Sequence, residues 1–183
     1  MLARIATLYT ALVLAANGAV AAPAIDPAAL TGDMRKLVVH EAPRAAGGDF
    51  GDLDGAGFAL SDFAGEIVVL NFWATWCAPC RKEMPSLDAL QAALGDRGLE
   101  VVAVATGRNA PDAIRRFFDE TGVTHLHPYN DPRMDLARGM AVLGLPVTVI
   151  LDREGREIAR LTGEADWNGP AARAVLEGLL ADT

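Results

Sequence analysis

Two segments of the chain are apolar on consecutive positions, which is the pattern of a strand buried on both faces. Residues 66–73 read EIVVLNFW, and residues 99–105 read LEVVAVA. A strand that is apolar on both alternate sets lies in the middle of a sheet that is covered on each side. These two segments therefore predict the centre of a layered α/β domain.

Segments with helical periodicity alternate with these strands. Over residues 78–94, apolar residues recur at helical spacing from Met84 to Leu94, and Gly95 follows as a stop signal. Pro85 should kink this helix because proline has no backbone N–H to donate. The same signals predict helices over 111–121, from Asp131-Pro132 to about Gly139 and after Asn168-Gly169-Pro170, short strands over 57–60 and 124–129, and a hairpin of 146–151 with 156–161.

This order of elements predicts one α/β domain with a mixed sheet flanked by helices, parallel at its centre and antiparallel at an edge. Residues 23–56 are rich in Ala, Pro, Gly and Asp and lack sustained periodicity, so we expect a linker over 23–47 and a folded domain over 48–183. In residues 1–22, Arg4 precedes an apolar run and a small-residue A-x-A end. This pattern predicts a secretory signal peptide or, if it is not cleaved, an N-terminal anchor.

Composition narrows the classes of function. The chain has 24 acidic and 16 basic residues, a net charge of −8, which argues against nucleic acid as a partner because phosphate binding needs a basic surface. Its two cysteines are too few for a disulfide-rich scaffold. Their spacing and their place in the chain carry the chemical signal.

The two cysteines stand where the first buried strand has ended and a helix begins, in the run Trp76-Cys77-Ala78-Pro79-Cys80. Cys77 falls at or next to the helix N-cap, where free backbone N–H groups and the helix dipole favour a thiolate. Cys80 follows one turn later and is shielded by the chain. We therefore predict a redox-active disulfide in which Cys77 attacks and Cys80 resolves the mixed disulfide.

Other roles for the cysteines fit less well. A structural disulfide closing so short a loop would stabilise the fold by only about 2 kcal/mol. A zinc site would need two further ligands, and His40, His125 and His127 do not offer a zinc-finger spacing. A haem-attachment motif would need histidine after Cys80, where Arg81 stands. We expect neither a metal nor another cofactor, and we expect the histidines of segment 124–129 to be half-exposed.

The run NFWATWCAPCRKEMP over residues 71–85 resembles the active-site segment of the TlpA/ResA group of thioredoxin-like proteins. The run GLPVTVI over residues 144–150 resembles the cis-proline loop of that family and the strand after it. The similarity extends over about residues 50–180, and residues 110–130 match the helix and strand that the family inserts into the thioredoxin fold. The resemblance implies a thioredoxin-like fold.

The resemblance also implies which residues contact a client protein. Pro146 would follow a cis peptide bond, and the loop would place backbone groups of Leu145 beside Cys77. Together with Trp76, Ala78 and Pro79, these are the expected substrate-binding residues. For Trp76 a packed aromatic in the core remains an equal alternative.

Glu83 lies three residues after Cys80, so on a helix it shares the same face at about 5–6 Å. A carboxylate there could take the proton of Cys80, and its charge would raise the thiol pKa and favour a reducing couple. The alternative is an ordinary solvated carboxylate; the family has a matching glutamate, and the resemblance implies a catalytic one. The positive charges of Arg81 and Lys82 would lower the thiol pKa instead, and we expect both side chains to be solvated.

The function implied by the resemblance is that of an exported thiol-disulfide oxidoreductase, a periplasmic reductant that is tethered or free. Its expected partners are exported proteins with cysteine pairs, in cytochrome c maturation or in copper-site assembly of respiratory oxidase, and a membrane electron donor of thiol-reducing type. We expect a monomer.

Three other functions on the same fold stay in view. A disulfide oxidase or isomerase would need a stabilised thiolate, and Ala78-Pro79 supplies no cation for it. A copper-binding module of the Sco type would carry Cys-x-x-x-Cys rather than Cys-x-x-Cys. A peroxidase would have Thr or Ser where Ala74 stands.

Overall fold

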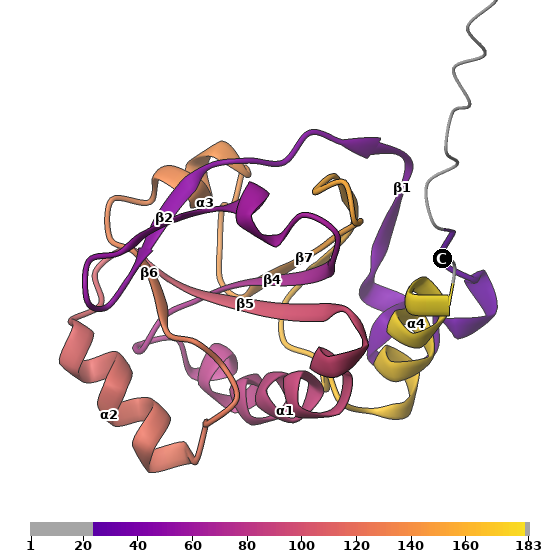
Figure 1. Ribbon diagram of the computed structural model, residues 1–183. Helices are drawn as coiled ribbons and strands as arrows, with labels where there is room; N and C mark the ends of the chain where they lie inside the picture. The colour runs from indigo at the N-terminus through magenta and orange to yellow at the C-terminus, as the bar shows by residue number, and fades with distance from the viewer. Residues whose placement is uncertain (1–23, 182–183) are drawn as a thin grey trace, which may run out of the picture.

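A computed structural model describes residues 24–181, which form an eight-stranded mixed sheet with helices on both faces (Figure 1). The strands follow the order β1-β8-β7-β4-β5-β6-β2-β3. The strands are β1 Val38–Arg44, β2 Asp49–Asp52, β3 Gly57–Ala59, β4 Ile67–Trp73, β5 Leu99–Thr106, β6 Tyr129–Asp131, β7 Val147–Leu151 and β8 Glu157–Thr162. The helices are α1 Ala78–Leu94, α2 Pro111–Thr121, α3 Asp135–Gly139 and α4 Pro170–Ala181, with 3-10 turns η1 Pro27–Ala29, η2 Gly32–Lys36, η3 Leu60–Phe63 and η4 Gly95–Arg97.

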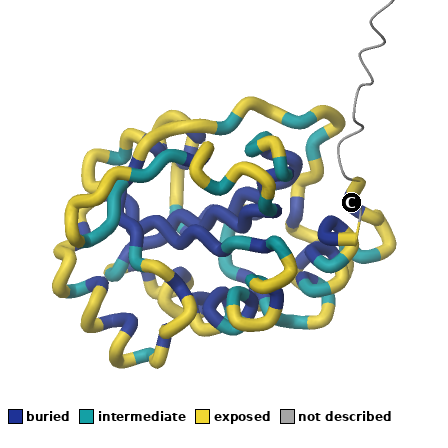
Figure 2. Tube along the Cα trace, in the orientation of Figure 1, coloured by how far each residue is buried: buried dark blue, intermediate teal, exposed yellow. Residues whose placement is uncertain are grey.

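The centre of the sheet is parallel and its flanks are antiparallel. β5 pairs in parallel with β4 and β6, while β7 pairs antiparallel with β4 and β8. Every residue of β4 is buried, as the dark centre of Figure 2 shows. Its odd-numbered apolar residues share a cluster with α1, α2 and α4, and its even-numbered ones share a cluster with α3. The prediction of a strand buried on both faces is confirmed.

The interpretation of residues 23–47 as a linker is wrong for most of that segment. β1 pairs antiparallel with β8 from Val38, opposite Arg160, and forms one edge of the sheet. Met34 of η2 is buried in the same cluster as α1 and α4. The few large apolar residues here are spaced too irregularly to show a period, and contacts distant in sequence order the segment instead.

The expected signal peptide or anchor at residues 1–22 lies outside the described residues. Between residues 24 and 181, no helix has the length and apolar character that crossing a membrane requires.

Two element boundaries also differ from the prediction. The strand expected over 124–129 is β6, which begins only at Tyr129, and the segment before it is held by Asp88, whose Oδ1 accepts from three successive backbone N–H groups: Thr124, His125 and Leu126. The helix expected from Asp131 begins at Asp135. The Asp131 carboxylate accepts from the N–H groups of Asp135 and Ala137, so it stands before the helix as a capping group.

Candidate active site

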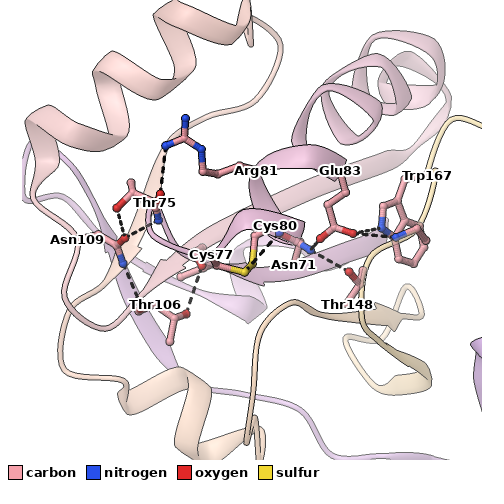
Figure 3. The surroundings of a disulfide bond; sticks show 12 residues. Asn71, Thr75, Cys77, Cys80, Arg81, Glu83, Thr106, Asn109, Thr148 and Trp167 are labelled. Carbon is pink, nitrogen blue, oxygen red and sulfur yellow. Dashed lines mark hydrogen bonds between the residues drawn. A yellow bond between two sulfur atoms is a disulfide. The ribbon is translucent and has the colours of Figure 1, made fainter.

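A disulfide joins Cys77 and Cys80 at the N-terminus of α1, with Cα atoms 5.3 Å apart (Figure 3). Cys77 is the N-cap residue in extended conformation, and its Sγ accepts from the N–H of Cys80 at 3.4 Å. Cys77 is 6% exposed and Cys80 is fully buried. Of the two cysteines, only Cys77 therefore has surface that another protein can reach.

Asn109 of the loop after β5 and Arg81 of α1 hold the segment that leads into the disulfide. Asn109 Oδ1 accepts from the Thr75 backbone N–H at 2.8 Å and from the Thr75 hydroxyl at 2.9 Å. Arg81 donates to the Thr75 carbonyl oxygen and places its guanidinium 4.8 Å from the centre of the Phe117 ring. Arg81 thus turns toward α2 and away from the sulfurs, as Figure 3 shows.

The Leu145–Pro146 peptide bond is cis, as the resemblance implied. Pro146 is buried and its carbonyl oxygen accepts from the Gly163 N–H, while half-buried Leu145 packs against the cluster that includes both cysteines. Trp76 is 67% exposed, so its interpretation as a core aromatic is wrong. Ala78 and Pro79 are also exposed.

Glu83 is buried, with 3% exposure, so the alternative of a solvated surface carboxylate is wrong. Its Oε1 accepts from Asn71 Nδ2 at 2.9 Å. Its Oε2 accepts from the Ala165 backbone N–H at 3.1 Å and from Trp167 Nε1 at 3.3 Å (Figure 3). Strand β4, helix α1 and the loop before α4 therefore meet at this carboxyl group.

Burial raises the pKa of Glu83 from its ordinary 4.5 to about 7, although three hydrogen bonds to the carboxylate oppose that change. The nearby charge of Glu164 raises the pKa further. A carboxyl group with a pKa near neutrality can both accept and release a proton at physiological pH. The neighbouring Lys82 is exposed but not free, because its Nζ lies 2.6 Å from Glu164 Oε1.

Glu83 also borders a small hollow of about 240 Å³ on the side of Lys82 and Glu164. Residues of η2 form another part of its lining, Asp33 and Lys36. Lys36 donates to the Glu164 carbonyl oxygen at 2.6 Å, which ties η2 to the loop that binds Glu83. The N-terminal segment thus helps to shape the surroundings of the buried acid.

Three residues of this site were not predicted from the sequence: Asn71, Thr148 and Trp167. Asn71 Nδ2 donates to Glu83 and also to Thr148 Oγ1 at 2.9 Å, while Asn71 Oδ1 is buried without a hydrogen-bond partner. The available signal was a single amide in the otherwise apolar run EIVVLNFW, because a buried polar side chain needs a partner.

The three histidines lie apart from the cysteines, each beside a carboxylate. His40 Nε2 is 2.7 Å from Glu157, His125 Nδ1 is 3.0 Å from Asp88, and the third contact joins His127 and Asp52. Within residues 24–181, no group of three or more His, Cys, Asp or Glu side chains is placed to hold a metal ion.

Comparison with known proteins agrees with this geometry. The Redoxin family matches residues 38–179. The thiol:disulfide interchange protein HelX of Rhodobacter capsulatus is 35% identical over 141 residues, which cover 77% of this chain and 73% of HelX. The thiol-disulfide oxidoreductase ResA of Bacillus thuringiensis subsp. konkukian is 32% identical over 113 residues, and the match spans 64% of the length of ResA.

Among solved structures, a Chlorobium tepidum protein described as a thiol:disulfide interchange protein DsbE superposes with a TM-score of 0.65 at 28% identity. That match covers 78% of this chain and 99% of the other. The prediction of a thioredoxin-like fold with a mixed sheet is confirmed. The extent of the family match, the paired cysteines at a helix N-terminus and the cis-proline loop together place the chain in the Redoxin family, among its thioredoxin-like members of the TlpA/ResA group.

Proposed function

We propose that this protein is an exported thiol-disulfide oxidoreductase that reduces disulfides in client proteins. The observation that carries the proposal is the asymmetry of the cysteine pair: Cys77 is partly exposed at the N-terminus of α1, and Cys80 is fully buried, one turn before the buried acid Glu83 on the same helix. Relatives named as thiol-disulfide oxidoreductases support this class of activity. The export pattern of residues 1–22 supports a site of action outside the cytoplasm.

The reaction begins with the reduced protein. The Cys77 thiolate attacks one sulfur of a client disulfide, so that a Cys77–client disulfide forms and the other client sulfur leaves as a thiolate, which takes a proton from water. Cys80 then attacks the Cys77 sulfur, its proton passes to the Glu83 carboxylate, and the second client thiolate leaves. Two electrons have moved to the client, and the Cys77–Cys80 disulfide has formed.

The charges around the pair favour the reducing direction. A strong oxidant needs a stabilised thiolate, and the segment Ala78-Pro79 between the cysteines carries no cation. Arg81 is engaged with Thr75 and Phe117, and Lys82 with Glu164. We therefore prefer a reductase to an oxidase or isomerase.

The finer role follows from the family resemblance. We propose clients with cysteine pairs in cytochrome c maturation or copper-site assembly, and a membrane electron donor that returns the Cys77–Cys80 disulfide to the dithiol. These assignments rest on the similarity of residues 71–85 and 144–150 to the TlpA/ResA group.

The test is the reduction potential of the Cys77–Cys80 pair, measured by equilibration with glutathione or dithiothreitol buffers. A value near that of thioredoxin, about −270 mV, supports a reductant. A value near about −120 mV would make the protein an oxidant and overturn the proposed direction.

A further inference from the structure

A large hollow borders Trp76, the residue before Cys77, and has no role in the chemistry described so far. Its volume is about 840 Å³, and it lies between Trp76, the loop after β5, helix α3 and the segment 142–145 that leads to Pro146. Two of the four large hydrophobic side chains exposed within residues 24–181 border it: Trp76, and Leu143 at 99% exposure. Exposed apolar side chains gathered at one hollow indicate a binding surface.

The wall of this hollow formed by α3 is held in a fixed shape. Met134 and Ala141, which bracket α3, are the two non-glycine residues with positive φ in the described chain, at 60° and 53°. The carboxylate of Asp131 anchors the start of the wall, and Arg160 donates to the Met140 carbonyl oxygen at 2.8 Å near its end. Uncommon backbone conformations persist where the surroundings impose them, and they concentrate at functional sites.

Charge at the rim of the hollow is positive although the whole chain is acidic. Three arginines border it, Arg108, Arg133 and Arg138, against one aspartate, Asp135. Asp135 lies 2.7 Å from Arg133 and 3.7 Å from Arg138, so it forms an ion pair with each of them. Arg108 forms no ion pair or side-chain hydrogen bond with any residue between 24 and 181. Two positive charges therefore remain in excess.

We propose that this hollow selects the client: it binds an extended segment next to the client cysteine, with a large apolar side chain between Trp76 and Leu143 and a carboxylate facing Arg108. This inference rests on the proposed function, because the hollow shares Trp76 and Leu145 with the site of disulfide exchange. An acidic, apolar client segment is complementary to the surface in both shape and charge. The preferred substrate is therefore an acidic peptide segment rather than a basic one.

The test uses three synthetic peptides of equal length, each closed by one internal disulfide. The first has leucine next to a cysteine and two aspartates beyond it. The second replaces the aspartates with lysines, and the third replaces the leucine with serine. The full reduced protein is mixed with each peptide, and every rate is divided by the rate with hydroxyethyl disulfide, which is too small to fill the hollow.

We expect the first peptide to exceed the third by about tenfold in kcat/KM, which corresponds to about 1.4 kcal/mol. It should exceed the second by about fivefold in 50 mM salt, because two exposed ion pairs contribute modestly. This second difference should shrink in 500 mM salt, since salt screens exposed charges.

Variants locate the effect. Leu143→Ser should reduce the preference for leucine, and Arg108→Gln should reduce the preference for aspartate, each relative to the same variant's rate with hydroxyethyl disulfide. Arg116→Gln is the matched control, because Arg116 is an exposed arginine of α2 that does not border the hollow. It should leave both preferences unchanged.

The outcomes separate this inference from the proposed function. If the wild type does not reduce hydroxyethyl disulfide, the proposed function fails. If it reduces all three peptides at equal normalised rates, or prefers the lysine peptide, the hollow does not select acidic clients while the oxidoreductase proposal stands. If sedimentation shows a dimer that Leu143→Ser dissociates, the hollow is a contact between two copies and the inference is overturned.

Discussion

Replacing Glu83 by glutamine should remove a large pH dependence of stability. Folding raises the pKa of Glu83 from 4.5 to about 7, so the folded protein holds this proton more tightly than the unfolded chain. The stabilisation is complete below pH 4.5 and is lost as the pH rises toward and through 7. At 1.36 kcal/mol per pKa unit, the loss amounts to about 3 kcal/mol.

Glutamine keeps the shape of the side chain and cannot ionise. Its amide oxygen can accept from Ala165 N–H and Trp167 Nε1–H, as Glu83 Oε2 does. If the Asn71 amide rotates by half a turn, its unpartnered Oδ1 can accept from the new amide nitrogen. The Glu83→Gln variant should therefore fold without two amide NH2 groups, those of Asn71 and of the new glutamine, facing each other.

The assay is urea unfolding of the oxidised protein and of the variant at intervals from pH 4 to pH 8. Over this range the free energy of unfolding of the wild type should fall by about 3 kcal/mol more than that of Glu83→Gln. Glu120→Gln, an exposed change on α2, is the control and should run parallel to the wild type. Parallel curves for Glu83→Gln as well would show that Glu83 titrates normally and that its burial does not raise its pKa.

Three other results are expected. Cys80→Ser should accumulate a mixed disulfide through Cys77 on a non-reducing gel, while Cys77→Ser should lose exchange; trapping by Cys77→Ser alone would reverse the assigned roles. Glu83→Gln should slow the resolution of the mixed disulfide by about 10²-fold or more, as measured by stopped-flow fluorescence. It should also lower the pKa of the cysteine thiols, as measured by thiolate absorbance. If neither value changed, Glu83 would have no part in the proton transfer. Deleting residues 1–44 should lower the free energy of unfolding in urea by several kcal/mol, because burial of Met34 alone contributes about 1.5–3 kcal/mol. An unchanged midpoint of the urea transition would contradict the packing of η2 and β1.

The parts of the fold that the sequence predicts are those whose signals are local. β4 is apolar at nearly every position, and α1 has a start, a stripe and a stop within 18 residues. Contacts distant in sequence escaped prediction. Met34 is ordered by helices that lie far along the chain, and a single methionine among alanines, prolines and charged residues shows no period.

In the site, too, local features could be predicted from the sequence and those that depend on distant residues could not. Cys77, Cys80 and Glu83 are related by helical spacing, so their proximity could be inferred. The burial of Glu83 could not, because it depends on Ala165 and Trp167, more than 80 positions away. The helical spacing predicts that Glu83 is near Cys80, but it does not predict whether Glu83 is buried or exposed to water.

The hollow bordered by Trp76 and the hollow bordered by Glu83 share no lining residue. A client seated over Cys77 would cover one of them and leave the other open beside Glu83. Electrons would then cross to the client at Cys77, while the proton leaves to water through the separate hollow lined by Lys82 and Glu164. The bound client could exclude water from the sulfurs during the exchange, and the enzyme would not have to release its client before it released the proton.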